Sequence, residues 1–181
     1  MLLSDKDIFD AMETGALTVN PPDRYDVLVK SASIDMRLHP VIQVIRPEKI
    51  DRAIFIDPTR MANVQSQIAT YAEQLELRPD QPFVMDPGVF VIGAAAEQVE
   101  LSEALAARIE GKSSLARFGI QVHLTAPKID PGWRLNNITL EIINLAQFRV
   151  ALFPMMEIAA LMVEPLKTPA TQAYRGRFSA G

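Results

Sequence analysis

The side chains whose types and spacing suit chemistry are concentrated between residues 110 and 144. This stretch opens with Gly111-Lys112-Ser113-Ser114, and Arg117 follows. Two hydroxyls that can cap a short helix, with a lysine and an arginine within one turn, form the kind of group that binds phosphate. An ordinary capped helix with two solvated cations has the same residues, so both interpretations stay open on this segment alone.

The run Gly111-Lys112-Ser113 also ends the P-loop pattern. That pattern needs a glycine five residues before Gly111, and Ala106 stands there. The P-loop interpretation is therefore weak.

A tight turn is expected at Asp130-Pro131-Gly132-Trp133. Proline fixes its own φ, and glycine permits a sharp reversal of the chain. Asp130 could accept a hydrogen bond from a sugar hydroxyl, with Trp133 packed nearby. A simple Asx-type turn is the alternative.

The segment 138–143 alternates in the manner of a strand. Thr139, Glu141 and Ile143 share one face of it, because successive side chains point to opposite sides. Glu141 is a candidate general base. A solvated glutamate on a strand face is the commoner role for a single carboxylate.

Metal chemistry of the familiar zinc deaminase type is not expected. The chain has two histidines, His39 and His123, far apart in sequence, and no cysteine. A His/Cys zinc site therefore cannot form, and disulfides are excluded.

The elements that position these residues are predicted to be mostly short strands. Ser4 and Asp7 resemble a capping box that opens a helix, which Gly15 ends. A second helix is expected over residues 59–73. Alternation and turn signals predict the following strands: 34–38, 41–45, 53–56, 75–77, 82–85, 89–94, 98–101, 120–124, 138–143, 149–153 and 158–163. This spacing favours a mainly β fold, a sandwich or jelly-roll-like barrel.

The amino-acid composition is typical of a single globular domain. The 181 residues are 49% hydrophobic and 22% charged, which suits one globular domain over 1–181, and residues 168–181 read as a flexible C-terminal tail. The net charge of −4 argues against nucleic acid as a partner. No segment predicts a membrane span or a secretory signal, and we expect a cytoplasmic location.

The motifs together resemble one known family. Gly111–Gly119, Val122–Ala126, Ile129–Trp133 and Thr139–Glu141 are similar, in order and spacing, to the dCTP deaminase family of the dCTP deaminase/dUTPase superfamily. Weaker similarity extends over nearly the whole chain, from Leu3 to Pro165.

The resemblance implies a fold and an activity. Members have a distorted, dUTPase-like β-barrel core with a few short helices, and they form homotrimers with active sites between subunits. They deaminate dCTP to dUTP and ammonia without zinc, and magnesium is bound through the nucleotide triphosphate. Some members cleave dUTP to dUMP and pyrophosphate, in addition or instead.

The resemblance also implies roles for particular residues. Glu141 would be the general base, Ser113 and the carbonyl of Ala126 would place the water, and Arg117 would stabilise developing charge. The remaining residues would bind the substrate: Lys112 and Ser114 the phosphates, Asp130 the 3′-hydroxyl with Trp133 nearby, and Tyr174 part of the C-terminal clamp.

The chain departs from the family pattern in several places, among them His39, Met155 and Ala159, which stand where the family usually has glycine. It is one residue longer between Trp133 and Glu141, and its tail after residue 168 is shorter. Three functions therefore stay open: a dCTP deaminase, an enzyme that cleaves dUTP alone or in addition, and a catalytically silent nucleotide-binding trimer.

Overall fold

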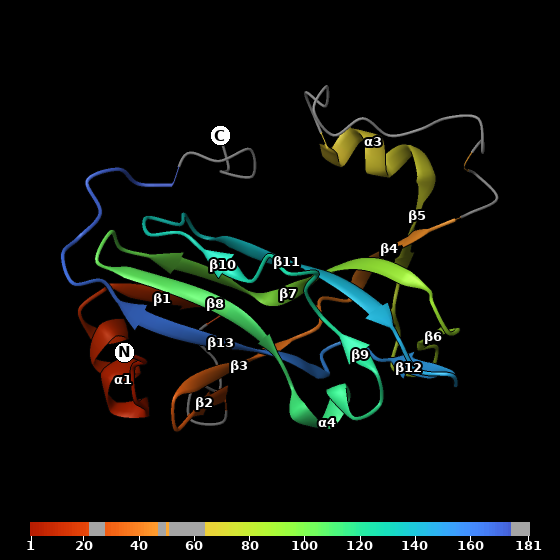
Figure 1. The fold of residues 1–181 in the computed structure, drawn as a ribbon, viewed down its shortest axis with the longest axis horizontal. Helices are drawn as coiled ribbons and strands as arrows, with labels where there is room; N and C mark the ends of the chain where they lie inside the picture. The colour runs from red at the N-terminus through yellow and green to blue at the C-terminus, as the bar shows by residue number, and fades with distance from the viewer. Residues whose placement is uncertain (22–27, 47–49, 51–63, 175–181) are drawn as a thin grey trace.

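The computed structural model describes residues 1–21, 28–46, 50 and 64–174, and in this part the chain forms antiparallel β-sheets (Figure 1). The larger sheet has the strand order β5-β4-β7-β11-β9, and β1 also pairs with β7. Its strands are Leu17–Asn20 (β1), Val41–Ile45 (β4), Ala72–Glu76 (β5), Phe90–Leu101 (β7), Ile120–Gln121 (β9) and Asn136–Asn144 (β11).

A second sheet packs against the first. Its order is β10-β8-β13-β3-β2. The strands are Val29–Lys30 (β2), Ser33–Arg37 (β3), Leu105–Gly111 (β8), Lys128–Ile129 (β10) and Glu157–Pro165 (β13). A small third sheet pairs Phe83–Met85 (β6) with Val150–Leu152 (β12).

The core lies between the two larger sheets. Along β7 and β11 alternate side chains are buried, so each strand contributes one apolar face to it. Packing is tight at Gly93, where an added Cβ would lie 3.1 Å from Ile142 of the neighbouring strand β11 and 3.2 Å from Leu38. The mainly β fold with a few short helices that the sequence predicted is confirmed.

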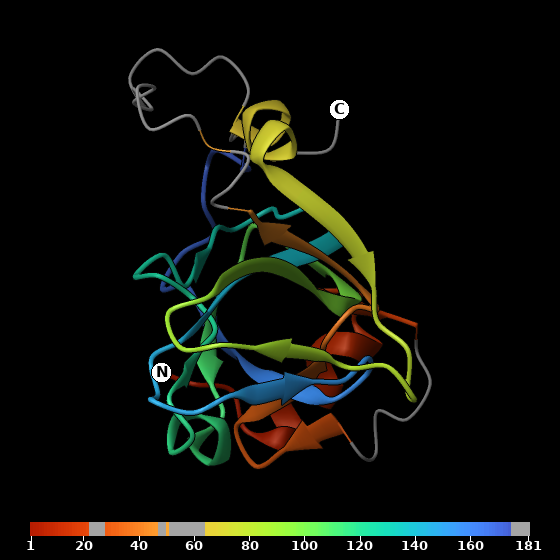
Figure 2. The ribbon, with the colours of Figure 1, turned by 90° about the vertical axis from the view of Figure 1, so that its right-hand side faces the viewer.

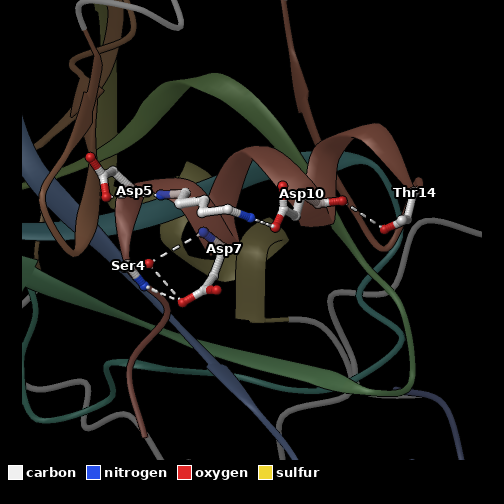
Figure 3. Close-up of polar contacts among 6 residues, drawn as sticks. Ser4, Asp5, Asp7, Asp10 and Thr14 are labelled. Carbon is white, nitrogen blue, oxygen red and sulfur yellow. Dashed lines mark hydrogen bonds and ion pairs between the residues drawn. The ribbon is translucent and has the colours of Figure 1, made fainter.

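Three helices supplement the sheets in the described part. Helix α1 (Asp5–Glu13) begins with the predicted capping box, in which Ser4 and Asp7 bond each other reciprocally (Figure 3). It ends before Gly15, whose φ of +71° suits glycine. Helix α3 (Val64–Tyr71) lies beside β4 and β5, at one end of the molecule (Figure 2). It covers residues 64–71 of the predicted 59–73 helix. Residues 72–73 belong to strand β5 instead, and residues 59–63 lie outside the described residues.

Helix α4 (Ser113–Ala116) is a single turn between β8 and β9. It lies at the lower edge of the view in Figure 1, directly after the end of β8. The motif run that begins at Gly111 is therefore carried by a strand end and one helical turn.

Several predicted strands match the structure and others do not. The strand 41–45 is found with those bounds, whereas only residues 120–121 of the predicted strand 120–124 form a strand. The predicted strands 89–94 and 98–101 are one continuous strand, β7. Strands β1 and β8 were not predicted, and the predicted strand 53–56 lies outside the described residues.

The strand at 34–38 is not half-buried as its alternation suggested. In β3 the polar Asp35 is as buried as its apolar neighbours Ile34 and Met36. A buried carboxylate needs a compensating cation. For Asp35 that cation is Lys112, from the motif that begins at Gly111.

Candidate functional site

Glu141 lies in the middle of β11, on the face of the larger sheet that points away from the core. Its neighbour on β7 is Ile92, and its own strand presents Thr139 and Ile143 on the same side. Ile92 and Ile143 are half-buried, while Leu140 and Ile142 point into the core. The carboxylate therefore lies beside two half-buried isoleucines, on a face that also carries Thr139, Gln43 and Gln121.

The loop between β9 and β10 reaches this carboxylate. The backbone N–H of Leu124 donates to Glu141 Oε2 across 3.4 Å. Ala126, the predicted water-placing residue, is two positions further along this loop. The structure therefore brings Glu141 and the 124–126 segment together.

Helix α4 carries the predicted hydroxyls and arginine in exposed positions. Ser113, Ser114 and Arg117 are exposed, and within the described part of the chain the guanidinium of Arg117 forms no ion pair. Neither hydroxyl caps the helix, because its N-cap is Lys112, whose side chain makes no capping bond. The expected capping by serine is wrong, and both hydroxyls face solvent in the single subunit.

Lys112 is held by two carboxylates of the smaller sheet. Its Nζ lies 2.6 Å from Asp35 Oδ2 on β3 and 2.8 Å from Glu157 Oε2 on β13. Partial burial on its own lowers the pKa of Lys112, but the hydrogen bonds to Asp35 and Glu157 outweigh it and raise that pKa above its usual value. The hydrogen bond from Lys112 is the main cause of the lowered pKa of Glu157. A phosphate would have to compete with these carboxylates for Lys112.

We expect Lys112→Met to lower the free energy of unfolding by about 2 kcal/mol, because the buried carboxylate of Asp35 loses its nearest cation. Lys30, 3.5 Å from Asp35, limits the loss. Thermal unfolding of the wild type and of Lys112→Met measures this loss of stability. Lys128→Met is the matched control, since Lys128 is exposed, and its effect should be below about 0.5 kcal/mol.

The pH dependence of that difference follows from the two pKa shifts. The raised pKa of Lys112 gives stability that is present below 10.5 and lost as the pH rises through the folded-state value. The lowered pKa of Glu157 gives stability that is present above 4.5 and lost as the pH falls through the folded-state value. The difference between wild type and Lys112→Met should therefore be largest at neutral pH and smaller toward both extremes. A difference that stays constant down to acid pH would contradict this account.

The Asp130–Trp133 turn meets the start of the C-terminal tail. The N–H of Tyr174 donates to the carbonyl of Pro131 across 3.0 Å, and the Tyr174 and Trp133 ring centroids are 5.0 Å apart. Gly132 has φ +72°, and an added Cβ there would come within 2.7 Å of Ala173. The structure therefore gathers Trp133 and Tyr174. Asp130 pairs with Lys128 across 2.7 Å instead of closing an Asx turn on its own backbone.

A cavity of about 260 Å³ lies behind α4 and β9. His123 lines it, with Nδ1 buried and without a hydrogen-bond partner in the described part of the chain, and Nε2 3.9 Å from Glu110. Glu141 is not part of its wall. The other lining residues are Gly111, Ala116, Gly119, Ile120, Gln121, Val122 and Leu145.

Sequence reasoning missed three groups that contact the predicted site. Asp35 and Glu157 hold Lys112, and the N–H of Leu124 holds Glu141. A carboxylate within the apolar run Ile34-Asp35-Met36 was a signal for the first, because such a group is buried only with a cation. A backbone N–H gives no signal in a sequence.

The predicted catalytic residues do not all meet within this chain. No hydrogen bond or ion pair between described residues joins Glu141 to Ser113 or Arg117. Exposed apolar side chains surround α4 and the 145–148 turn, namely Phe118, Leu145 and Phe148. The chain thus presents the Glu141 carboxylate and the Arg117 guanidinium as separate groups.

The described residues include no group of three or more His, Asp or Glu side chains that could hold a metal ion. Magnesium is expected as an ion carried by a triphosphate, whose oxygens are its preferred ligands. Among the helices described, none has the length and apolar character that crossing a membrane requires.

Comparison with known proteins agrees with this architecture. Residues 2–166 match the model of the family described as dCTP deaminase-like. A Mycobacterium leprae protein named dCTP deaminase, dUMP-forming, is 41% identical over 181 residues, which are 100% of this chain and 88% of that protein. The dCTP deaminase of Haloarcula marismortui is 38% identical over 174 residues, covering 96% of this chain and 85% of that protein.

A solved structure shows the same fold. The 2′-deoxycytidine 5′-triphosphate deaminase of Agrobacterium tumefaciens superposes with a TM-score of 0.68 at 21% identity, over 90% of this chain. The matched region is 47% of that chain, so this chain spans about half its length. With the family model and these relatives in agreement, the chain belongs to the dCTP deaminase-like family.

Proposed function

We propose that this protein hydrolyses dCTP to dUTP and ammonia, with Glu141 as the general base. The observation that carries the proposal is the position of the Glu141 carboxylate, which lies beside Ile92 and Ile143 on the outer face of the larger sheet and accepts from the Leu124 N–H. The names of the relatives support dCTP as the substrate.

The reaction consumes one water, and the carboxylate of Glu141 is ionised both before and after each turnover. Glu141 takes a proton from water as the water oxygen attacks C4 of the cytosine ring, and it passes this proton to N3. It then carries the proton of the new C4 hydroxyl to the amine, so that ammonia leaves and the C4 carbonyl forms. Ser113 and the carbonyl of Ala126 orient the water, and Arg117 stabilises the developing charge. Lys112, Ser114, Asp130, Trp133 and Tyr174 bind the phosphates and sugar, and magnesium comes with the triphosphate.

A second candidate is dUMP formation, in which dUTP is further cleaved to dUMP and pyrophosphate. The name of the Mycobacterium leprae relative favours it. Incubation with dCTP or dUTP and magnesium, followed by chromatography, separates the candidates. Accumulated dUTP supports the first and pyrophosphate supports the second. Nucleotide binding without turnover of either substrate would contradict both and leave a silent nucleotide-binding trimer.

We further propose that the protein works in the cytoplasm as a homotrimer and that Arg117 reaches Glu141 of a neighbouring copy. Both groups are accessible in the single subunit and do not meet there, and the apolar side chains around α4 suit burial against a second copy. In a ring of identical subunits, each interface would then form one complete site.

Arg117→Ala should lower kcat roughly 100-fold or more, because a charged donor at the reacting group is lost. Mixing Arg117→Ala with Glu141→Gln during refolding tests the shared site. In randomly mixed trimers about one interface in four combines an intact Glu141 with an intact Arg117, so about a quarter of wild-type activity should return. No recovery in verified mixed trimers would contradict a site shared between subunits, and a wild-type rate for Arg117→Ala would remove it from the mechanism.

A further inference from the structure

The backbone of Thr125 is in the left-handed region. Its φ is +61°, and in the described part of the chain only Met155 shares this feature among residues other than glycine. A β-branched side chain is strongly disfavoured there, because its Cβ substituents crowd the backbone. Such strain persists only where the surrounding structure imposes it, and it is concentrated at functional positions.

The loop around Thr125 is fixed on both sides. Before it, Val122 is buried in the core and the N–H of Leu124 bonds to Glu141. After it, Pro127 restricts Ala126 to extended conformations, and the carbonyl of Pro127 accepts from the N–H of Ile109 across 2.9 Å. The reversal between these two anchors falls on Thr125.

The threonine side chain does not hold the loop. Thr125 is exposed, and its hydroxyl has no hydrogen-bond partner in the described part of the chain. The left-handed backbone is therefore the property of this residue that matters for the geometry of the loop.

We propose that Thr125 is a positioning residue: its left-handed backbone aims the Leu124 N–H at Glu141 and so fixes the carboxylate that acts as the base. This rests on the proposed function of Glu141. The bond to Oε2 restricts the rotation of the carboxylate, and it leaves Oε1 available to take the proton from water. Thr125 itself touches no reacting atom.

Four substitutions at position 125 distinguish the contribution of the backbone conformation from that of the threonine side chain. Glycine and asparagine adopt positive φ more readily than threonine, so Thr125→Gly and Thr125→Asn should keep the loop. Thr125→Val keeps the branched shape and removes the hydroxyl. Thr125→Pro forces φ to about −65° and must reorient the segment.

We expect the first three variants to keep kcat within about three-fold of wild type, and Thr125→Pro to lose roughly 10- to 100-fold in kcat, the scale of a misplaced catalytic group. The KM of Thr125→Pro should change less than about three-fold, because the predicted substrate contacts are elsewhere. Thr125→Asn should also melt at a higher temperature than Thr125→Val, since it relieves the strain.

Three results would overturn the proposal: a wild-type kcat in Thr125→Pro, a loss in Thr125→Gly as large as in Thr125→Pro, or a loss of that size in Thr125→Val. If Thr125→Pro fails to fold, the glycine, asparagine and valine variants still decide, because the proposal requires all three to keep kcat.

A measurement without substrate separates this proposal from the proposed function. The amide proton of Leu124 can be observed by NMR after selective ¹⁵N-leucine labelling, and Leu124→Met assigns its signal. The signal should move on Glu141→Ala and on Thr125→Pro, and stay near its wild-type position in Thr125→Asn. An unmoved signal in Thr125→Pro overturns the positioning role even if the enzyme deaminates dCTP. A protein with the expected shifts but no turnover would refute the function alone.

Discussion

Replacement of Glu141 by glutamine should reduce kcat for dCTP at least about 1,000-fold, within the range that a positioned general base contributes. The amide keeps the shape of the side chain and can still accept from the Leu124 N–H, but it cannot take a proton from water. Nucleotide binding, measured by isothermal titration calorimetry, should stay within about three-fold of wild type, because the loss falls on the transition state.

A matched control comes from the same sheet. Glu76 is an exposed glutamate on β5, and Glu76→Gln makes the same chemical change away from β11. It should leave kcat and binding unchanged. If Glu141→Gln turned over dCTP at the wild-type rate, Glu141 would not be the base and the proposed mechanism would fail.

Replacement of Arg37 by leucine should lower the free energy of unfolding by about 3–5 kcal/mol, more than the loss expected for Lys112→Met. Glu97 on β7 is fully buried, and its carboxylate accepts from the backbone N–H of Arg37 across 2.8 Å and from Arg37 Nε across 2.5 Å. The pair joins the two packed sheets. Removal of the guanidinium leaves a buried charge without its partner, which costs more than the pair itself contributes.

The double variant Arg37→Leu/Glu97→Leu completes the test. A buried ion pair that is replaced by apolar groups of similar volume often loses little stability, so the double variant should recover most of the loss. Arg149→Leu is the control, because its pair with Asp86 is exposed on both sides. Unfolding should be followed at one fixed protein concentration, because the proposed trimer would make the measured stability depend on concentration. Equal, additive losses for the two single changes would show that the pair is not coupled.

The local sequence determined the parts of the fold that depend on neighbouring residues. The capping box at Ser4 and Asp7 and the β-branched run at 41–45 are short-range patterns, and the structure has the helix and the strand that they predict. The run from Gly111 to Glu141 likewise identified the family through residues close together in the chain. The roles assigned to its members remain predictions.

Strand β7 shows where local pattern is insufficient. Its centre, Gly93-Ala94-Ala95-Ala96-Glu97, has no apolar alternation and low β propensity, so two strands were predicted there. In the structure β7 continues through this stretch, while its register with β11 shifts between Asn137 and Thr139. The Asn137 side chain donates to the carbonyls of Ala95 and Ala96, which supports this stretch across the sheet.

Only the tertiary structure decided what the charged groups of the motif do. Lys112 reads as a phosphate ligand in sequence, yet it lies between Asp35 and Glu157, each more than forty positions away. Whether a carboxylate is buried, and which cation compensates it, depends on strands that meet only when the sheets pack. Residue type and spacing therefore defined the candidate chemistry, while packing determined which groups are engaged and which remain free to act.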